Sequence, residues 1–245
     1  MNTFTMKSEV RFSAVDSALN LTVIALSEMI QDATTGYLTK HEISNDLINP
    51  KYHRILVVIR NRMTCFSGLK LGDRVVAEVT LVKKSLAFFV LKTVIYREDT
   101  HEACARSYVQ LCSIDMDTRK LLPLNDIREY APLTPDDPEK VDFFPRWNYP
   151  NGNEYDVKDQ IVASTDIDYS NHLNNIAYFR YLLNCFPSDL LTYVNFREIE
   201  INYIKEAIEG STISVYYMIE GTDIYFLVKC GEDVLTKAKI AFTKD

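Results

Sequence analysis

One pattern occurs twice along this chain of 245 residues: an apolar helix pattern followed by a series of strand-like runs. In the first half, the helix pattern begins after Asn20, and β-branched and aromatic runs then occupy most of residues 55–113. In the second half, the helix pattern spans about 172–186, and strand-like runs follow near 195–204, 211–220, 222–230 and 233–243. A helix followed by antiparallel strands is an α+β arrangement, so the repetition predicts two similar α+β units.

The repeat has predicted boundaries. A strand is expected before each helix, at residues 7–15 and 157–164. Gly36 is expected to cap the first helix at its C-terminus, and Pro187 to stop the second. Residues 39–54 are polar, and we expect an irregular connection there. The expected buried faces consist of Leu26, Met29, Ile30 and Ala33 in the first helix, and of Ile176, Phe179, Leu182, Leu183 and Phe186 in the second.

A proline-rich stretch separates the two halves. Six of the eight prolines fall between residues 123 and 152. Because proline removes a backbone donor and opposes helix interiors, this composition predicts a long connection. The predicted organisation is an N-terminal unit at 1–122, a linker at 123–152 and a C-terminal unit at 153–245.

The two halves can also be aligned residue by residue. At an offset of 152 positions, Asp16 falls on Asp168 and Leu21 on Leu173; after the helices the offset becomes 138, with Gly72 on Gly210. The difference of 14 residues falls in the polar stretch 39–54. In this alignment Ala18, Asn20, Thr22 and Val23 stand where the second half has Ser170, His172, Asn174 and Asn175. We therefore expect one chemical site, at the mouth of the second helix, with the first half as scaffold or pocket wall.

Polar residues crowd the start of the second helix. They are Asp166, Asp168, Ser170, Asn171, His172, Asn174 and Asn175. Taken singly, Asp168 or Asn171 is better explained as a helix cap, and a lone histidine as a structural one. Together they place carboxylate, imidazole and unpaired backbone N–H groups where a substrate carbonyl could be bound.

This segment resembles the acyl-acyl carrier protein (acyl-ACP) thioesterases, whose second half carries D-x-D-x-N-x-H-x-N-N at the start of its central helix. Five positions match, namely Asp166, Asp168, His172, Asn174 and Asn175, whereas Ser170 stands where the family usually has asparagine. The resemblance implies a tandem hot-dog fold, in which each unit is a curved antiparallel sheet wrapped around a long helix. Two such units in one chain would form an intramolecular pseudo-dimer.

A second stretch resembles the same family. Tyr203, Lys205 and Glu206 correspond to positions of the family's E-Y-R-R-E-C, in which the lysine replaces an arginine. Family members often have cysteine next, but this chain has Ala207, which excludes a cysteine nucleophile at that place. Without the resemblance, Glu206 is as well explained as a solvated carboxylate before Gly210.

The resemblance implies a thioester hydrolase. Asp168, His172 and Glu206 are the expected catalytic residues, and Ser170, Asn174 and Asn175 are expected to bind the substrate or its oxyanion. Burial beside an acyl pocket would place Glu206 in an apolar environment and favour its action as a base. Whether His172 or Glu206 accepts the proton of the attacking water stays open. No cofactor and no metal is expected, because the sequence lacks a phosphate loop and metal-ligand spacing.

Three other activities remain possible. An acyl-CoA thioesterase would share the chemistry, whereas a hot-dog dehydratase would direct histidine and aspartate at the acyl β-carbon. A non-catalytic acyl-binding protein is disfavoured by the presence of both His172 and Glu206, although Ser170 and Ala207 speak mildly for it.

Composition limits the partners and the compartment. The net charge of −7 disfavours nucleic acid, and no apolar run is long enough for a membrane span. Five widely spaced cysteines suggest free thiols in a reducing cytoplasm. The expected partner is acyl carrier protein, and a homodimer is possible. Because carrier proteins are acidic, docking would need a local basic patch, for which the candidates are Arg60, Arg62, Lys70, Lys83 and Lys84.

Overall fold

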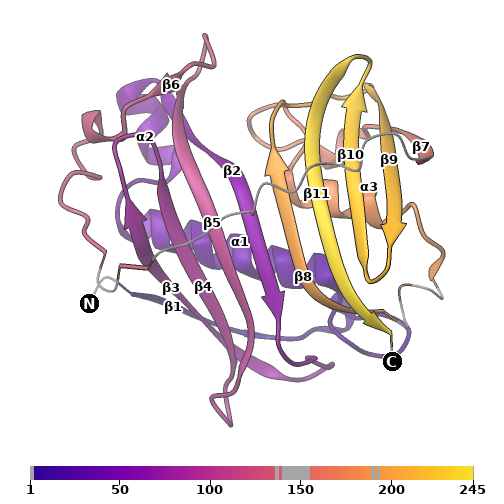
Figure 1. The fold of residues 1–245 in the computed structure, drawn as a ribbon. Coiled ribbons are helices and arrows are strands. Elements are labelled where there is room, and N and C mark those ends of the chain that lie inside the picture. Colours follow the sequence, from indigo (N-terminus) through magenta and orange to yellow (C-terminus); the bar gives the residue numbers. More distant parts are fainter. Residues whose placement is uncertain (1–2, 136–137, 140–154, 189–190, 192–193, 245) are drawn as a thin grey trace. The chain divides into compact units, whose positions relative to one another are not determined.

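The computed structural model describes residues 3–135, 138–139, 155–188, 191 and 194–244 (Figure 1). The chain divides into two compact units, with the break at residue 143 and with residues 16–18 grouped with the second unit. The repeat predicted from the sequence is confirmed, since each unit holds a helix followed by antiparallel strands. The linker residues 140–152 lie outside the described part, and the predicted boundaries at 122 and 153 stay a prediction.

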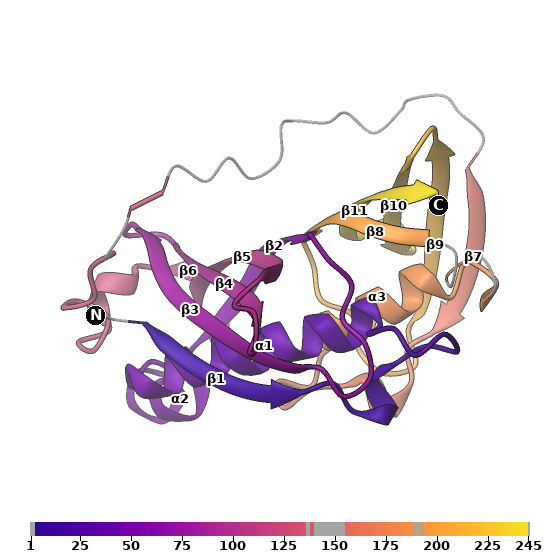
Figure 2. The same ribbon diagram turned by 90° about the horizontal axis from the view of Figure 1, so that it is seen from below.

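The N-terminal unit is a five-stranded antiparallel sheet in the order β1-β3-β4-β5-β2, with the short β6 paired to β5. Its helix α1 lies against β1, β3 and β4, and Figure 2 shows the sheet curving around it. The expected strand at 7–15 begins earlier and is shorter. The elements are β1 (Phe4–Glu9), α1 (Val23–Lys40), α2 (Asn45–Tyr52), β2 (Arg54–Cys65), β3 (Arg74–Lys84), β4 (Phe89–Arg97), β5 (Ala103–Asp115) and β6 (Leu121–Leu122).

The predicted C-cap at Gly36 is wrong. Gly36 lies inside α1, which continues to Lys40. A β-carbon on Gly36 would stand 2.4 Å from the ring of Phe4, so the glycine allows the first strand to approach the helix closely. Close packing, and not helix termination, explains this glycine.

The loop predicted for residues 39–54 is also wrong in part, because it contains the helix α2. Sequence periodicity missed this helix, since Ile48 is its only buried residue and Pro50 lies inside it. The helix is held from its first residue: the Asn45 side chain donates to the carbonyl of Leu56 (2.9 Å) and accepts from its N–H (2.6 Å).

Part of the proline-rich stretch packs on the N-terminal unit. Leu124, Ile127 and Tyr130 are fully buried. The Nζ of Lys84 donates to the carbonyls of Tyr130, Ala131 and Leu133, at 3.1, 2.8 and 2.7 Å. Lys84 is therefore engaged with the backbone of this stretch.

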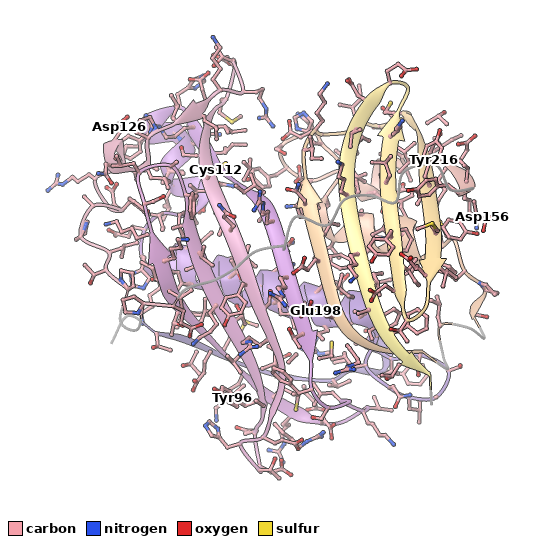
Figure 3. The ribbon with its side chains drawn as sticks, viewed as in Figure 1. Tyr96, Cys112, Asp126, Asp156, Glu198 and Tyr216 are labelled. Atoms are coloured by element: carbon pink, nitrogen blue, oxygen red, sulfur yellow. The ribbon has the colours of Figure 1, made fainter. Side chains whose placement is uncertain are left out.

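The C-terminal unit is a second antiparallel sheet, in the order β8-β11-β10-β9-β7. On its strand β9, Tyr216 (labelled in Figure 3) has Lys229 of β10 over its ring at 5.5 Å. In the described residues no helix is long and apolar enough to cross a membrane. The elements are β7 (Asp156–Ile161), α3 (Asn175–Leu183), β8 (Val194–Tyr203), β9 (Thr212–Glu220), β10 (Asp223–Cys230) and β11 (Asp233–Lys244).

Helix α3 is shorter and more deeply buried than predicted. It ends at Leu183, four residues before Pro187, and all its residues except Asn175 and Arg180 are buried. Phe186 lies beyond the helix and packs edge-on against Tyr217 and Phe226, with ring centroids 5.1 and 6.1 Å apart. The helical spacing of apolar residues continues in the sequence past the end of the helix, because Phe186 belongs to the same core.

Candidate active site

The start of α3 is built by two polar residues of the motif. Asn174 caps the helix, and its Oδ1 accepts the N–H of Ile176 at 2.8 Å. The backbone N–H of Asn174 donates to the carbonyl of Asp166 (2.9 Å), which ties the helix to the preceding 3₁₀ turn, Ser164–Asp166. The structure therefore gives the Asn174 oxygen a structural bond at the cap.

Asp166 stabilises this turn through bonds to α3. Its carboxylate accepts hydrogen bonds from Arg180 and from the hydroxyl of Tyr181 (2.7 Å). The Tyr181 hydroxyl also accepts the N–H of Ala163 at 3.1 Å. The first aspartate of the motif thus anchors the turn to α3.

Asp168 shapes the loop that presents the histidine. Its Oδ1 accepts two bonds from Ser170, one from the backbone N–H (2.8 Å) and one from Oγ (2.6 Å). The Asp168 N–H donates to the carbonyl of His172 at 2.9 Å, and Asn171 between them takes a left-handed conformation with φ of 62°. Asparagine tolerates this conformation better than most residues.

His172 lies between Ser170 and Glu206. Its Nδ1 is 3.4 Å from Ser170 Oγ, and its Nε2 is 3.4 Å from Glu206 Oε2. Four predicted site residues, Asp168, Ser170, His172 and Glu206, thus form a continuous series of polar contacts. The backbone ties the two segments that carry His172 and Glu206 to each other, since the N–H of Leu173 donates to the carbonyl of Ala207 at 2.8 Å.

The expected burial of Glu206 is wrong. Its side chain is 39% exposed and that of His172 is 24% exposed. Glu206 follows the end of β8 and lies outside any helix or strand, whereas the next residue, Ala207, is buried. The carboxylate is therefore accessible to water in this structure.

Two tyrosines support the helix start from inside the unit. The Tyr203 hydroxyl donates to the carbonyl of Asn175, the first residue of α3, at 3.2 Å, and its ring packs edge-on against Tyr178 at 5.6 Å. Burial raises the pKa of Tyr178 to about 12 and the pKa of Tyr203 well above its ordinary value, so both phenols stay protonated. Asn175 is half-buried, and its predicted substrate contact stays a prediction.

Cysteine chemistry finds no support at this site. All five cysteines are free thiols, and Cys104 and Cys112 are buried. Burial raises the pKa of Cys185, the cysteine nearest in sequence to the motif, to about 11. Among the described residues, no group of three or more histidine, cysteine or acidic side chains could hold a metal ion.

Solved structures share this fold over the whole chain. The acyl-ACP thioesterase from Bacteroides thetaiotaomicron has a TM-score of 0.81 and 18% identity, over 99% of this chain and 98% of that one. The 12:0-ACP thioesterase from Umbellularia californica has a TM-score of 0.88 and 17% identity, over 100% of this chain and 98% of that one. At these identities the likeness establishes the fold, which is the tandem hot-dog fold predicted from the sequence.

The sequence comparison concerns the half that carries the candidate site. Residues 150–244 match the family model described as the acyl-ACP thioesterase C-terminal domain. No curated protein sequence matches this chain. The predicted resemblance to the acyl-ACP thioesterase family is therefore confirmed, and it includes every candidate site residue.

Proposed function

We propose that this chain hydrolyses fatty acyl thioesters of acyl carrier protein and releases the free fatty acid. The observation that carries the proposal is the His172–Glu206 contact at the mouth of α3, within the segment that matches the family. A binding pocket needs neither an imidazole nor a carboxylate at this place, whereas hydrolysis needs a base and an ordered water.

The chemistry requires little beyond these groups. A water held between His172 and Glu206 gives up a proton as its oxygen attacks the thioester carbonyl carbon. The tetrahedral intermediate then expels the thiolate, which takes up the proton and leaves as the thiol. General-base action of this kind contributes about 10²–10⁴ in rate.

The start of α3 can stabilise the negative oxygen of the intermediate. A helix N-terminus carries a partial positive charge, and the side-chain amides of Asn174 and Asn175, whose NH₂ groups can donate, lie at this end of α3. Asp168 would hold the loop that orients His172, because it accepts two hydrogen bonds within that loop.

The carrier protein as partner rests on the family match. Of the five basic residues considered for docking, Lys84 is unsuitable, because its ammonium already donates to three backbone carbonyls. Lys83, on the same strand, lies over the ring of Phe88 at 5.4 Å. Action in the cytoplasm and assembly as a homodimer remain part of the proposal.

One assay separates the candidate activities. Purified protein is offered saturated acyl-ACP and acyl-CoA substrates of several lengths, and free thiol release is followed. The proposal expects release from acyl-ACP well above that from acyl-CoA, and its loss in the folded His172→Ala variant. Preference for acyl-CoA would indicate the alternative thioesterase, and tight acyl-ACP binding without thiol release would contradict hydrolysis altogether. A dehydratase would convert hydroxyacyl substrates without releasing thiol.

A further inference from the structure

Ser170 stands where the acyl-ACP thioesterase family usually has asparagine, and its hydroxyl contacts two neighbouring side chains. The hydroxyl is 2.6 Å from Asp168 Oδ1 and 3.4 Å from His172 Nδ1. It therefore lies between the carboxylate and the imidazole, and both of its neighbours are side chains of the same loop.

Proton counting assigns the contact with Asp168, and through it the role left to the hydroxyl toward His172. A serine hydroxyl has one proton to donate, and an ionised carboxylate can only accept. The short contact to Asp168 thus uses the Ser170 proton, which leaves only an acceptor facing His172. A neutral His172 that bonds to Ser170 must then carry its proton on Nδ1, and its unprotonated nitrogen is Nε2, 3.4 Å from Glu206.

We infer that Ser170 is a positioning residue that selects the Nδ1–H tautomer of His172 and so makes Nε2 the proton acceptor in the reaction. This assignment rests on the proposed hydrolysis for its catalytic meaning. Two acceptors, Nε2 and Glu206 Oε2, then face each other and can share the two protons of one water. When that water attacks, one proton moves to Nε2, and the imidazolium donates through Nδ1–H to Ser170, whose own proton stays with Asp168.

The loop does not depend on the hydroxyl for its fold. The backbone N–H of Ser170 makes its own 2.8 Å bond to Asp168, and this bond survives in a Ser170→Ala variant. The contact at 3.4 Å is longer than a usual N–H···O bond, as apo-state contacts of catalytic groups often are. Removing the hydroxyl should therefore change the tautomer and leave the structure in place.

The test reads the tautomer directly and needs no substrate. Protein with ¹⁵N-labelled histidine is studied by long-range ¹H–¹⁵N correlation at a pH where titration of the signals shows neutral rings. The chain has four histidines, and loss of one signal set in His172→Gln assigns the residue. We expect Nδ1–H in the wild type, a shift to Nε2–H in Ser170→Ala, where Glu206 is the acceptor left to the ring, and return to Nδ1–H in Ser170→Thr.

Kinetics complete the test. Ser170→Ala should lower kcat about tenfold or more with KM nearly unchanged, and Ser170→Thr should recover most of the loss. Ser214→Ala is the matched control, since its hydroxyl makes an equally short 2.6 Å bond to Asp159 in the same unit, on the exposed surface. An Nε2–H tautomer in the wild type, or an unchanged tautomer and kcat in Ser170→Ala, overturns the inference. Absence of thioesterase activity in the wild type would refute the proposed function and leave the tautomer result standing.

Discussion

The loops that lead into α1 and α3, here called the first and second helix mouths, have the same backbone and different side chains. An isolated antiparallel bridge closes the loop before each helix, joining Val15 to Leu21 in the first half and Ile167 to Leu173 in the second. These pairs are related by the offset of 152 that aligns the sequences. The repeat is therefore a property of the fold, although few residues are identical.

The turn inside each loop is also repeated. Leu19 and Asn171 both adopt left-handed conformations, with φ of 63° and 62°. Asp16 Oδ1 accepts the N–H of Ala18 at 2.9 Å, as Asp168 Oδ1 accepts that of Ser170 at 2.8 Å. An aspartate at this place is thus explained by the turn alone, without any catalysis.

The difference lies in what the repeated turn carries. Ala18 and Asn20 of the first mouth offer neither the hydroxyl nor the imidazole of Ser170 and His172. The loop is thus a structural element shared by both units, and the hydroxyl and the imidazole at these two aligned positions are present only in the second. Asp168 then has a second partner, Ser170 Oγ, which Asp16 lacks at the equivalent alanine.

The largest expected effect comes from removing the groups that only the second mouth has. His172→Ala and Glu206→Ala should each lower kcat/KM for acyl-ACP by at least about tenfold, because each removes one acceptor for the attacking water. The double variant should not be multiplicatively worse, since residues that act as a unit are non-additive. Circular dichroism and thermal unfolding check that the fold is kept. Multiplicative losses would show that the two residues act independently.

A large loss of stability is expected from a change in the 3₁₀ turn before α3, Ser164–Asp166. Asp166 bonds to Arg180 and Tyr181, whereas the aligned residue of the first unit is Ala14. Asp166→Ala should lower the free energy of unfolding by about 2 kcal/mol, because it leaves partly buried donors unpaired. Urea unfolding measures this loss of free energy. Asp159→Ala, which removes an exposed carboxylate, is the control and should cost less than about 0.5 kcal/mol. Equal losses would contradict the anchoring role of Asp166.

A smaller effect on specificity is expected from the first helix. If α1 lines the acyl chain, Met29→Trp should shift the preferred acyl length toward shorter chains by at least about threefold in relative kcat/KM. Glu28→Trp places the same side chain on an exposed position of α1 and should leave the preference unchanged. The measurement is a chain-length series on acyl-ACP. Identical chain-length preferences in both variants would show that α1 does not line the acyl chain.

The smallest effect concerns backbone strain. Leucine is poorly suited to the left-handed conformation of residue 19, and the second unit has asparagine at the aligned position. Leu19→Asn should raise the free energy of unfolding by up to about 1 kcal/mol without changing turnover, and Asn171→Leu should lower it by a similar amount. Both changes are measured by urea unfolding. A loss of stability in Leu19→Asn, or a gain in Asn171→Leu, would show that the two turns are not equivalent.

Much of the fold followed from the sequence, because long β-branched runs and matched element order are strong signals. Strand β9 at Thr212–Glu220 and β11 at Asp233–Lys244 lie within a residue or two of the prediction. Helix α2 was missed because it buries one isoleucine, and Gly36 was misread because its partner, Phe4, is distant in sequence. Local pattern does not report contacts of that kind.

The candidate site was proposed from residue type and spacing, but its internal geometry could not be predicted in this way. No sequence pattern indicates that Ser170 bonds to Asp168 or that Asp166 bonds to Arg180, since these depend on the path of the loop. The exposure of Glu206 likewise depends on where β8 ends.

We propose that the chemistry resides in the second unit alone, and Asn20→Ala, measured beside His172→Ala, tests this proposal most directly. Asn20 occupies the aligned position in the first mouth, and its amide cannot act as a base. Hydrolysis of acyl-ACP by both variants should be measured under identical conditions, with the fold checked by thermal unfolding. The account predicts that Asn20→Ala stays within a few fold of the wild type, while His172→Ala loses at least about tenfold. A comparable loss in a folded Asn20→Ala protein, or near-normal turnover in folded His172→Ala, would contradict it.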